Sequence, residues 1–235
     1  MKRITFILSV ILLLCSCGKE AVVCHEGYLS IGRLATVKRV QTKAVEDDLA
    51  IRILTEDGTP VEGCSYSAGE VPARIPLTPG SYIVEAFTEN LSTWKDDKGE
   101  LAFIGSKTFE IVDDETTNVV LIIPAINYII RAEMPENFST WFTDWSVTLS
   151  DGERTVNINE GEAAVFDNES ISIYISATNT DNESYTGNKV NISGLAAGHA
   201  YTIKYSFAAD GKLDVEINID EDFSDGGNED ITITE

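Results

Sequence analysis

The sequence predicts an all-β chain that folds into two tandem antiparallel β-sandwich domains, and three observations lead to this fold class. Apolar and polar residues alternate over many short stretches, which is the pattern of strands with one buried face. Turn residues separate these stretches at spacings of roughly 8 to 12 residues. A helical pattern is expected only briefly, near residues 135–142.

The first domain is expected over residues 28–124, because Pro124 ends an apolar run that is typical of a strand. The segment Asp57-Gly58-Thr59-Pro60 predicts a turn within this domain. The expected strands contain many β-branched and aromatic residues. They cover residues 29–31, 49–53, 81–87, 107–112 and 118–123.

The second domain is expected over residues 125–235. Two segments indicate that it repeats the plan of the first, since residues 77–82 and 195–201 both run from a leucine through a glycine to a tyrosine. Alternating apolar residues follow in both cases, although the gap between glycine and tyrosine differs by one residue. The strands expected here cover residues 126–130, 147–149, 171–175, 190–192, 201–205, 213–219 and 231–233.

The first seventeen residues predict export. Lys2 and Arg3 precede an apolar run, and Ser16 precedes Cys17 as in the processing site of a lipoprotein. The run has about eleven residues, too few for a membrane-spanning helix of roughly 20. Residues 1–16 are therefore expected to be a signal peptide. Cys17 would carry the lipid, with palmitate among its acyl chains, and hold the protein at the outer membrane, facing the cell exterior.

Residues 17–27 are expected to form a tether between the lipid and the fold. Loss of the signal peptide removes Lys2 and Arg3, and so moves the net charge from -22 to -24. Such an acidic surface repels phosphate backbones, so no nucleic acid partner is expected. The membrane, through the lipid on Cys17, is the first expected partner.

Cys24 and Cys64 remain besides the lipidated Cys17, and an exported protein can join them in a disulfide. This bond would close a loop of about forty residues and stabilise the fold by roughly 4 kcal/mol. Two unpaired thiols are the alternative. Together with His25 these cysteines offer three zinc ligands but lack a fourth, so no metal site and no cofactor are expected. The other histidine, His199, is expected in a solvated turn.

No catalytic residue is assigned. The sequence has neither the glycine-flanked serine of a nucleophile elbow nor a glycine-rich loop before a helix that would bind phosphate. Its 39 acidic residues leave a carboxylate pair for glycoside hydrolysis open. Residues 220–226 resemble a calcium loop at two positions but lack its glycine and closing glutamate, which favours a solvated acidic loop.

The three tryptophans are candidates for binding, because aromatic side chains stack on sugar rings or fill a partner's pocket. Trp94 lies in a long polar stretch over residues 90–100 that is expected to be a loop. Loops often carry function, so Trp94 is the candidate ligand contact. Trp141 and Trp145 flank Phe142 just before an apolar strand, and we expect them to be buried in the core of the second domain.

Several segments resemble a catalogued domain of unknown function that occurs in Gram-negative surface lipoproteins. They are the strand and turn motifs at residues 27–31, 42–44, 79–86, 105–111 and 142–148. That family is in turn similar to the fimbrillins, the subunits of type V pili. The resemblance implies two tandem transthyretin-like or Ig-like antiparallel β-sandwich domains.

In fimbrillins a protease trims the first strand after a basic residue, and a neighbouring subunit fills the groove with its own strand. The resemblance therefore makes Arg33 and Arg39, together with Lys38, candidate trimming sites. Ordinary surface charge is the alternative, because basic residues beside an edge strand also discourage unwanted pairing. Residues 228–235 suit either the protein's own edge strand or a strand donated to a neighbour.

Taken together, these features predict a non-enzymatic, lipid-anchored protein of the cell surface that acts in adhesion or pilus-like assembly. Its partners would be other pilus-like subunits or surface glycans. Two alternatives stay open. A glycan-binding module would show an exposed aromatic platform, and a surface hydrolase would show two carboxyl groups that converge in a cleft.

Overall fold

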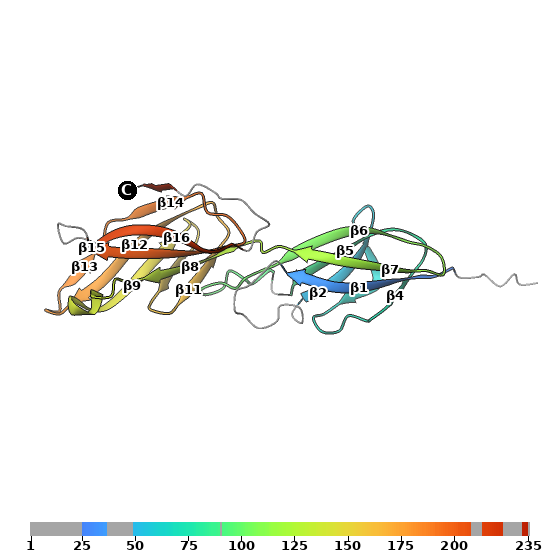
Figure 1. The fold of residues 1–235 in the computed structure, drawn as a ribbon, viewed down its shortest axis with the longest axis horizontal. Coiled ribbons are helices and arrows are strands. Elements are labelled where there is room, and N and C mark those ends of the chain that lie inside the picture. The colour runs from blue at the N-terminus through green and yellow to red at the C-terminus, as the bar shows by residue number, and fades with distance from the viewer. Residues whose placement is uncertain (1–24, 37–48, 90, 208–212, 223–231, 235) are drawn as a thin grey trace, which may run out of the picture.

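The computed structural model describes residues 25–36, 49–89, 91–207, 213–222 and 232–234. The predicted signal peptide, Cys17, Cys24 and Arg39 lie outside these residues. Figure 1 shows an elongated molecule in which strands dominate, as the all-β prediction requires. Within the described part of the chain, no helix is long and apolar enough to cross a membrane.

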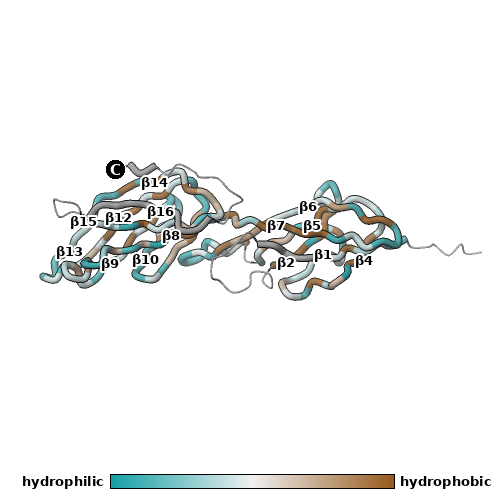
Figure 2. Tube along the Cα trace, in the orientation of Figure 1, coloured by the Kyte–Doolittle hydropathy of each residue, from teal (hydrophilic) through white to brown (hydrophobic). Residues whose placement is uncertain are grey.

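Two sheets of the N-terminal half pack around one hydrophobic core, and they have the strand orders β4-β1-β7 and β3-β2-β5-β6. The sequence alternation explains the core, since Tyr82, Val84 and Ala86 of β5 are buried while the residues between them are partly exposed. Figure 2 shows hydrophobic positions recurring along these strands. The strands are β1 (Gly27–Thr36), β2 (Leu49–Thr55), β3 (Pro60–Tyr66), β4 (Ile75–Leu77), β5 (Gly80–Thr88), β6 (Ile104–Ile111) and β7 (Thr116–Ile123).

Two further sheets of the C-terminal half enclose a second core, which contains Tyr128, Phe166 and Tyr201. One sheet has the order β10-β9-β12-β14-β17, with β13 paired to β12, and the other has the order β11-β8-β15-β16. The strands are β8 (Tyr128–Glu133), β9 (Phe142–Ser150), β10 (Thr155–Ile158), β11 (Ala163–Phe166), β12 (Ser170–Asn179), β13 (Ser184–Thr186), β14 (Val190–Ser193), β15 (His199–Phe207), β16 (Leu213–Asp222) and β17 (Thr232–Thr234).

The brief helix expected near residues 135–142 is a single 3-10 turn, η2 (Phe138–Thr140). Residues 220–222, expected in a solvated acidic loop, belong instead to β16. The strand therefore continues beyond the last alternating apolar residue, because pairing with β15 extends to Asp222.

Both halves share one strand plan. The order β3-β2-β5-β6 matches β10-β9-β12-β14, and the order β4-β1-β7 matches β11-β8-β15. In each half the first strand pairs in parallel with a late one, β1 with β7 and β8 with β15. These two parallel pairs depart from a purely antiparallel arrangement. They are possible because the intervening strands supply the long crossover that parallel neighbours need.

The shared plan lies in the topology and not in the segments that suggested a repeat. Residues 77–82 lead into β5, whose counterpart in the other half is β12. Residues 195–201 lead into β15, whose counterpart is β7. The likeness between these segments therefore reflects a common way of entering a strand from a glycine turn. The domain limits 28–124 and 125–235 stay predictions.

A third hydrophobic cluster lies where the two halves meet. It joins Trp94 and Ala102, which precede β6, to Ile129, Val165 and Ala200 of the C-terminal half. Trp94 is only 6% exposed, so the candidate ligand contact is corrected to a packing residue. The physical reason is that the polar loop around it folds back onto the C-terminal half, where its ring is covered.

Polar groups reinforce this joint. The buried side chain of Asn127 accepts a hydrogen bond from the N–H of Ala102 at 3.1 Å and donates one to the carbonyl of Glu100 at 3.0 Å. Lys98 Nζ lies 2.5 Å from Glu162 Oε1, and the Lys98 carbonyl accepts from the N–H of Val165 at 2.7 Å. The loop before β6 is therefore held to the C-terminal half by backbone and side-chain bonds.

Candidate ligand-binding site

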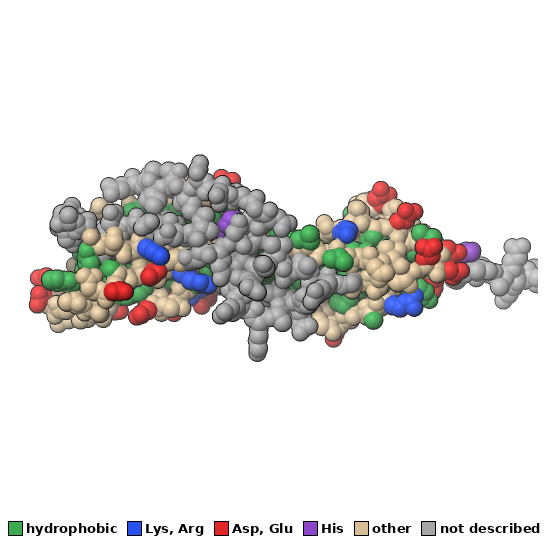
Figure 3. Space-filling view, in the orientation of Figure 1, with side chains coloured by type: hydrophobic (Ala, Val, Ile, Leu, Met, Phe, Trp, Pro, Cys, Tyr) green, Lys and Arg blue, Asp and Glu red, His purple; other side chains and the backbone are tan. Residues whose placement is uncertain are grey.

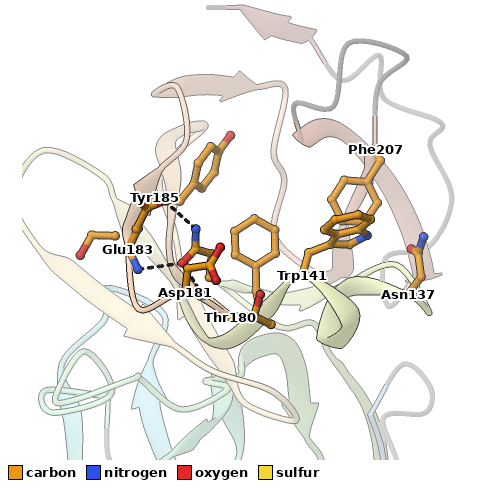
Figure 4. A pocket seen from close by; sticks show the side chains of 10 residues that line it. Asn137, Trp141, Thr180, Asp181, Glu183, Tyr185 and Phe207 are labelled. Atoms are coloured by element: carbon orange, nitrogen blue, oxygen red, sulfur yellow. Dashed lines mark hydrogen bonds between the residues drawn. The ribbon is translucent and has the colours of Figure 1, made fainter.

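A hollow of about 600 Å³ opens at the end of the C-terminal half that lies farthest from the start of β1. Three segments that are distant in sequence line it: residues 137–142, residues 179–185 and Phe207 at the end of β15. Figure 4 shows side chains from these segments facing one space. We name it the distal hollow. Its lining combines aromatic rings with amides, hydroxyls and carboxylates.

The turn η2 presents Trp141 at the rim of the distal hollow. The N–H of Trp141 donates to the carbonyl of Phe138 at 3.0 Å, and its own carbonyl accepts from the N–H of Thr180 at 3.1 Å. The N–H and the carbonyl of Trp141 are thus both hydrogen-bonded, while the residue is 58% exposed. The prediction that Trp141 is buried in the second core is therefore wrong. Trp145 is partly buried against that core.

A β-bulge redirects the start of β9 toward the hollow. Along the β9–β12 pair, Asp144 lies opposite Thr178, but Phe142 lies opposite Asn179. Thr143 is the extra residue, and its hydroxyl donates to the carbonyl of Thr178 at 3.3 Å. Bulges bend a strand and change the direction of its side chains. The bulge at Thr143 thus puts the start of β9 out of phase with the alternation of buried and exposed residues in the rest of the strand.

Stacked aromatic rings form the floor of the distal hollow. The rings of Phe138 and Phe142 stack with centroids 4.6 Å apart, and Tyr185 lies 5.6 Å from Phe142. Phe207 also stacks on Phe138, with ring centroids 6.4 Å apart. Such contacts fix the rings in place without any ligand. A partner would therefore meet a preformed aromatic surface.

The turn between β12 and β13 forms an acidic lip. Asn179 organises it, because its Oδ1 accepts from the N–H groups of Asp181 and Glu183 at 3.0 and 2.7 Å. Its Nδ2 donates to Glu183 Oε2 at 3.0 Å. Figure 4 shows Asp181 and Glu183 together on one side of the hollow, across from Trp141 and Phe207.

A second hollow of about 560 Å³ adjoins the first and shares Ser184 and Tyr185 with it. We name it the sheet hollow, because side chains of β9, β10, β12 and β13 line it. Trp145 and Asp144 contribute to its lining, and the other polar groups are hydroxyls and amides. Tyr185 thus stands between two neighbouring spaces with different linings.

His199 does not lie in a solvated turn, and that prediction is wrong. It is the first residue of β15 and is 2% exposed, with its ring 5.7 Å from that of Tyr201. Its burial follows from the alternation along β15, since His199 lies on the same face of the strand as Tyr201 and Ile203 of the second core.

The expected cysteine chemistry is only partly visible. Cys64 is buried in the N-terminal core and forms no disulfide within the described residues, while its expected partner Cys24 lies outside them. The pairing stays a prediction. His25, the first residue that the structure describes, pairs with Asp113. Among the described residues, no group of three or more His, Cys, Asp or Glu side chains could hold a metal ion.

Both strands considered for exchange between subunits pair within the chain. β1 continues to Thr36, so the candidate trimming site Arg33 lies inside this strand and not after it. The register of β1 against β7 shifts between Ile31 and Leu34. β17 pairs with β14 over three residue pairs, so the terminal strand is docked on its own sheet.

A family defined by a domain of unknown function, DUF4493, matches residues 25–235. The chain belongs to this family. This confirms the resemblance to a domain of unknown function, and the match covers all the residues that the structure describes. No functionally curated protein matches the sequence.

The DUF4493 chain is also similar to solved bacterial structures. One is a candidate cell adhesion protein from Parabacteroides distasonis, with a TM-score of 0.50 and 8% identity over 83% of this chain and 99% of that one. A fimbrial assembly protein from the same species has a TM-score of 0.49 at 11% identity, covering 83% and 98%. The fimbrial anchor protein Mfa2 from Porphyromonas gingivalis has a TM-score of 0.43 at 11% identity, covering 83% and 96%.

At these identities the likeness shows the fold alone. The cell adhesion protein from Parabacteroides distasonis therefore shares the fold of the DUF4493 chain.

Proposed function

We propose that this DUF4493 protein is a lipid-anchored, non-enzymatic protein of the cell surface that acts in adhesion or pilus-like assembly. The observation that carries the proposal is the separation of its two ends. β1 follows the predicted tether and begins at one end of the elongated molecule, and the distal hollow opens at the other (Figure 1). A lipid on Cys17 would therefore leave the hollow facing away from the membrane.

The charge at the tethered end bears on which part of the protein contacts the membrane. Glu26, Asp113, Asp114 and Glu115 lie close together there, since the N–H of Asp114 donates to the carbonyl of Glu26 at 3.1 Å. Figure 3 shows Asp and Glu side chains gathered at this end. Phosphate-bearing head groups would repel them, so the lipid, and not the folded body, is expected to make the membrane contact.

The distal end supports adhesion. Tryptophan is enriched among the residues that contribute most to binding, and Trp141 is 58% exposed on a held backbone beside a stacked aromatic floor. A surface protein that must capture a partner would use such a preformed contact at the end away from its anchor.

The carboxylates of the hollow argue against a glycoside hydrolase. Such enzymes place two carboxyl groups on either side of the bond that they cleave. Asp181 and Glu183 come from one turn and lie on the same side of the hollow (Figure 4). Glu183 also accepts a hydrogen bond from Asn179 at 3.0 Å. This pair cannot flank a substrate bond, which supports a binding role.

Anchoring and adhesion can be tested on cells that carry the wild-type protein or the Cys17→Ala variant. The wild type should fractionate with the outer membrane, be labelled on intact cells and increase their adhesion to an epithelial cell layer. Cys17→Ala should lose all three properties, and mass spectrometry should find a lipidated Cys17 at the wild-type N-terminus. Unchanged fractionation of Cys17→Ala, or a different N-terminus, would contradict the anchor.

Pilus-like assembly is the second mode that the strands support. β1 lies between β4 and β7, so cleavage after Arg33 would free most of β1, cleavage after Arg39 would free all of it, and either would open a place for a neighbour's strand. β17 is a candidate donor because it pairs with β14 over only three residue pairs. Deletion of residues 228–235 should then leave a folded monomer that no longer assembles. Loss of the circular dichroism signal of the fold would instead make β17 an internal strand.

A further inference from the structure

We infer that the distal hollow and the sheet hollow together bind a neutral glycan chain, with Tyr185 between two sugar-binding positions. The inference rests on the proposed adhesive function and adds the chemical class of the ligand and its place on the molecule. Four features carry it: an exposed aromatic surface, uncharged polar groups, an acidic lip, and the two lining residues that the hollows share.

The distal hollow offers the apolar surface that a sugar ring needs. A pyranose ring has a face of C–H groups that packs on flat aromatic side chains. Trp141 is exposed at the rim, while Phe142, Tyr185 and Phe207 are partly buried in the lining. The ring of Phe142 is already stacked on the buried ring of Phe138, with centroids 4.6 Å apart. Binding would therefore cost little ordering of the protein.

Polar groups around this floor match the hydroxyls of a sugar. Asn137, Thr180 and Asp181 line the distal hollow and are exposed. An amide donates and accepts, a hydroxyl does both, and an ionised carboxylate accepts only, so sugar hydroxyls find partners of each kind. The carboxylates of Asp181 and Glu183 would repel uronate or sialate groups, which favours a neutral glycan.

The sheet hollow makes the expected ligand a chain of sugars and not a single ring. It shares Tyr185 and Ser184 of β13 with the distal hollow, so a ligand of two or more sugars that spans β13 would contact both linings. Apart from the single acid Asp144, its polar lining consists of hydroxyl and amide side chains. Besides the shared Ser184 and Tyr185, these belong to Ser146, Asn157, Asn159, Ser176, Thr178 and Thr186.

A lysine-rich peptide is the rival ligand, because aromatic rings and carboxylates also bind ammonium groups. Two observations favour the glycan. One oxygen of Glu183 is already engaged by Asn179 at 3.0 Å, which leaves Asp181 as the less committed acid of the distal hollow. The sheet hollow adds only Asp144, so successive cationic side chains would meet mostly hydroxyls and amides.

The test uses full-length protein in detergent on an array of neutral oligosaccharides, of uronate- and sialate-containing oligosaccharides, and of lysine-rich peptides. Neutral glycans should bind, and Trp141→Ala should weaken the binding by about tenfold or more. Ile122→Ala is the matched control, because Ile122 lies in β7 of the other half and is 57% exposed, against 58% for Trp141. It should leave the binding unchanged.

Two further variants test the class of ligand and the second position. Asp181→Asn should keep neutral binding within about threefold and strengthen the binding of acidic glycans, because it removes a repelling charge at the rim. A second sugar ring should raise the wild-type affinity. Thr186→Arg, which places a long side chain in the sheet hollow only, should remove that gain and keep the affinity for a single ring.

Several outcomes would overturn the inference: no glycan binding on the array, glycan binding that Trp141→Ala leaves unchanged, or peptide binding that Asp181→Asn abolishes. The outcome for the proposed function is separate. If cells carrying the protein adhere but the purified protein binds no glycan, adhesion stands and the inference falls. If the purified protein binds glycans and its cells adhere no better than cells without it, the adhesive function falls.

Discussion

Trp94→Ala should destabilise the fold far more than Trp141→Ala, although the polar sequence around Trp94 suggests exposure. The Trp94 ring is buried with Ala102, Ile129 and Val165, and Arg154 and Lys95 place cationic groups 5.8 and 5.1 Å from it. Truncation of a buried tryptophan to alanine costs about 3–5 kcal/mol. The cluster is small and its loop can partly collapse into the space, so we expect a loss near the lower end, about 3 kcal/mol.

Differential scanning calorimetry on the full-length protein measures this loss. A change of 1 kcal/mol shifts the midpoint of a chain of this size by about 2–4 °C, so Trp94→Ala should lower it by about 6–12 °C. Trp141→Ala is the matched control, because it removes the same atoms from an exposed position and should change stability by less than about 0.5 kcal/mol. Equal shifts for the two variants would refute the burial of Trp94 at the joint.

Other predictions concern the joint between the two halves, the buried phenol of Tyr128 and the cysteines. Gly99 has a φ of +82°, and a Cβ there would lie 3.1 Å from the Trp94 carbonyl oxygen and from Val165. Gly99→Ala should therefore destabilise the fold by about 1–2 kcal/mol through backbone strain alone. The close contacts of the new Cβ should add to this loss. Gly152→Ala is its control, since Gly152 has a φ of +93° with no atom within 4 Å of a Cβ; equal melting points for the two variants would contradict the close approach. Burial raises the pKa of the Tyr128 phenol, which also donates to the Asn168 carbonyl at 2.7 Å. In the unfolded chain this phenol ionises near pH 10, so the stability that it confers should be complete below about pH 10 and lost as the pH rises further, and Tyr128→Phe should flatten the alkaline unfolding curve. A disulfide between Cys24 and Cys64 predicts no reactive thiol in the denatured mature protein, and two reactive thiols would exclude it.

Much of the strand content is predictable because the pattern that predicts it is local. The alternation over residues 81–87, 107–112 and 118–123 corresponds to β5, β6 and β7 within a few residues. A strand with one buried face must alternate, so the signal does not depend on the partner. β3 is not predictable in this way, because Gly63 interrupts it and most of its side chains are exposed.

The candidate site is much less predictable, and the tryptophans show why. The charged residues beside Trp94 suggest a solvated loop, yet Lys95 pairs with Asp167 at 3.0 Å and Lys98 with Glu162 at 2.5 Å. Both lysines thus form ion pairs with residues of the C-terminal half. Trp141 lies near an apolar strand and so resembles a core residue, but η2 and the bulge at Thr143 turn it outward.

Tyr185, Asp181 and Phe207 have no motif that marks them as one site. Asp181 belongs to a polar turn that sequence reasoning treats as solvated, and the two aromatic residues lie on strands that ordinarily bury such side chains. They line one hollow because β12 and β15 end, and β13 begins, at the same end of the C-terminal half. Their meeting depends on strand order, which local alternation does not encode.

The sequence by itself determines the class of the molecule: an acidic, all-β chain behind a predicted lipoprotein signal, with strands where apolar residues alternate. These are properties of composition or of a few neighbouring residues, so they can be established before any long-range contact is known. Only the tertiary structure decides that the two halves share a strand plan with parallel pairs, that Trp94 closes the joint, and that Trp141 faces a hollow. Each of these depends on the register between segments far apart in the chain, where a shift of one residue reverses which side chains are buried.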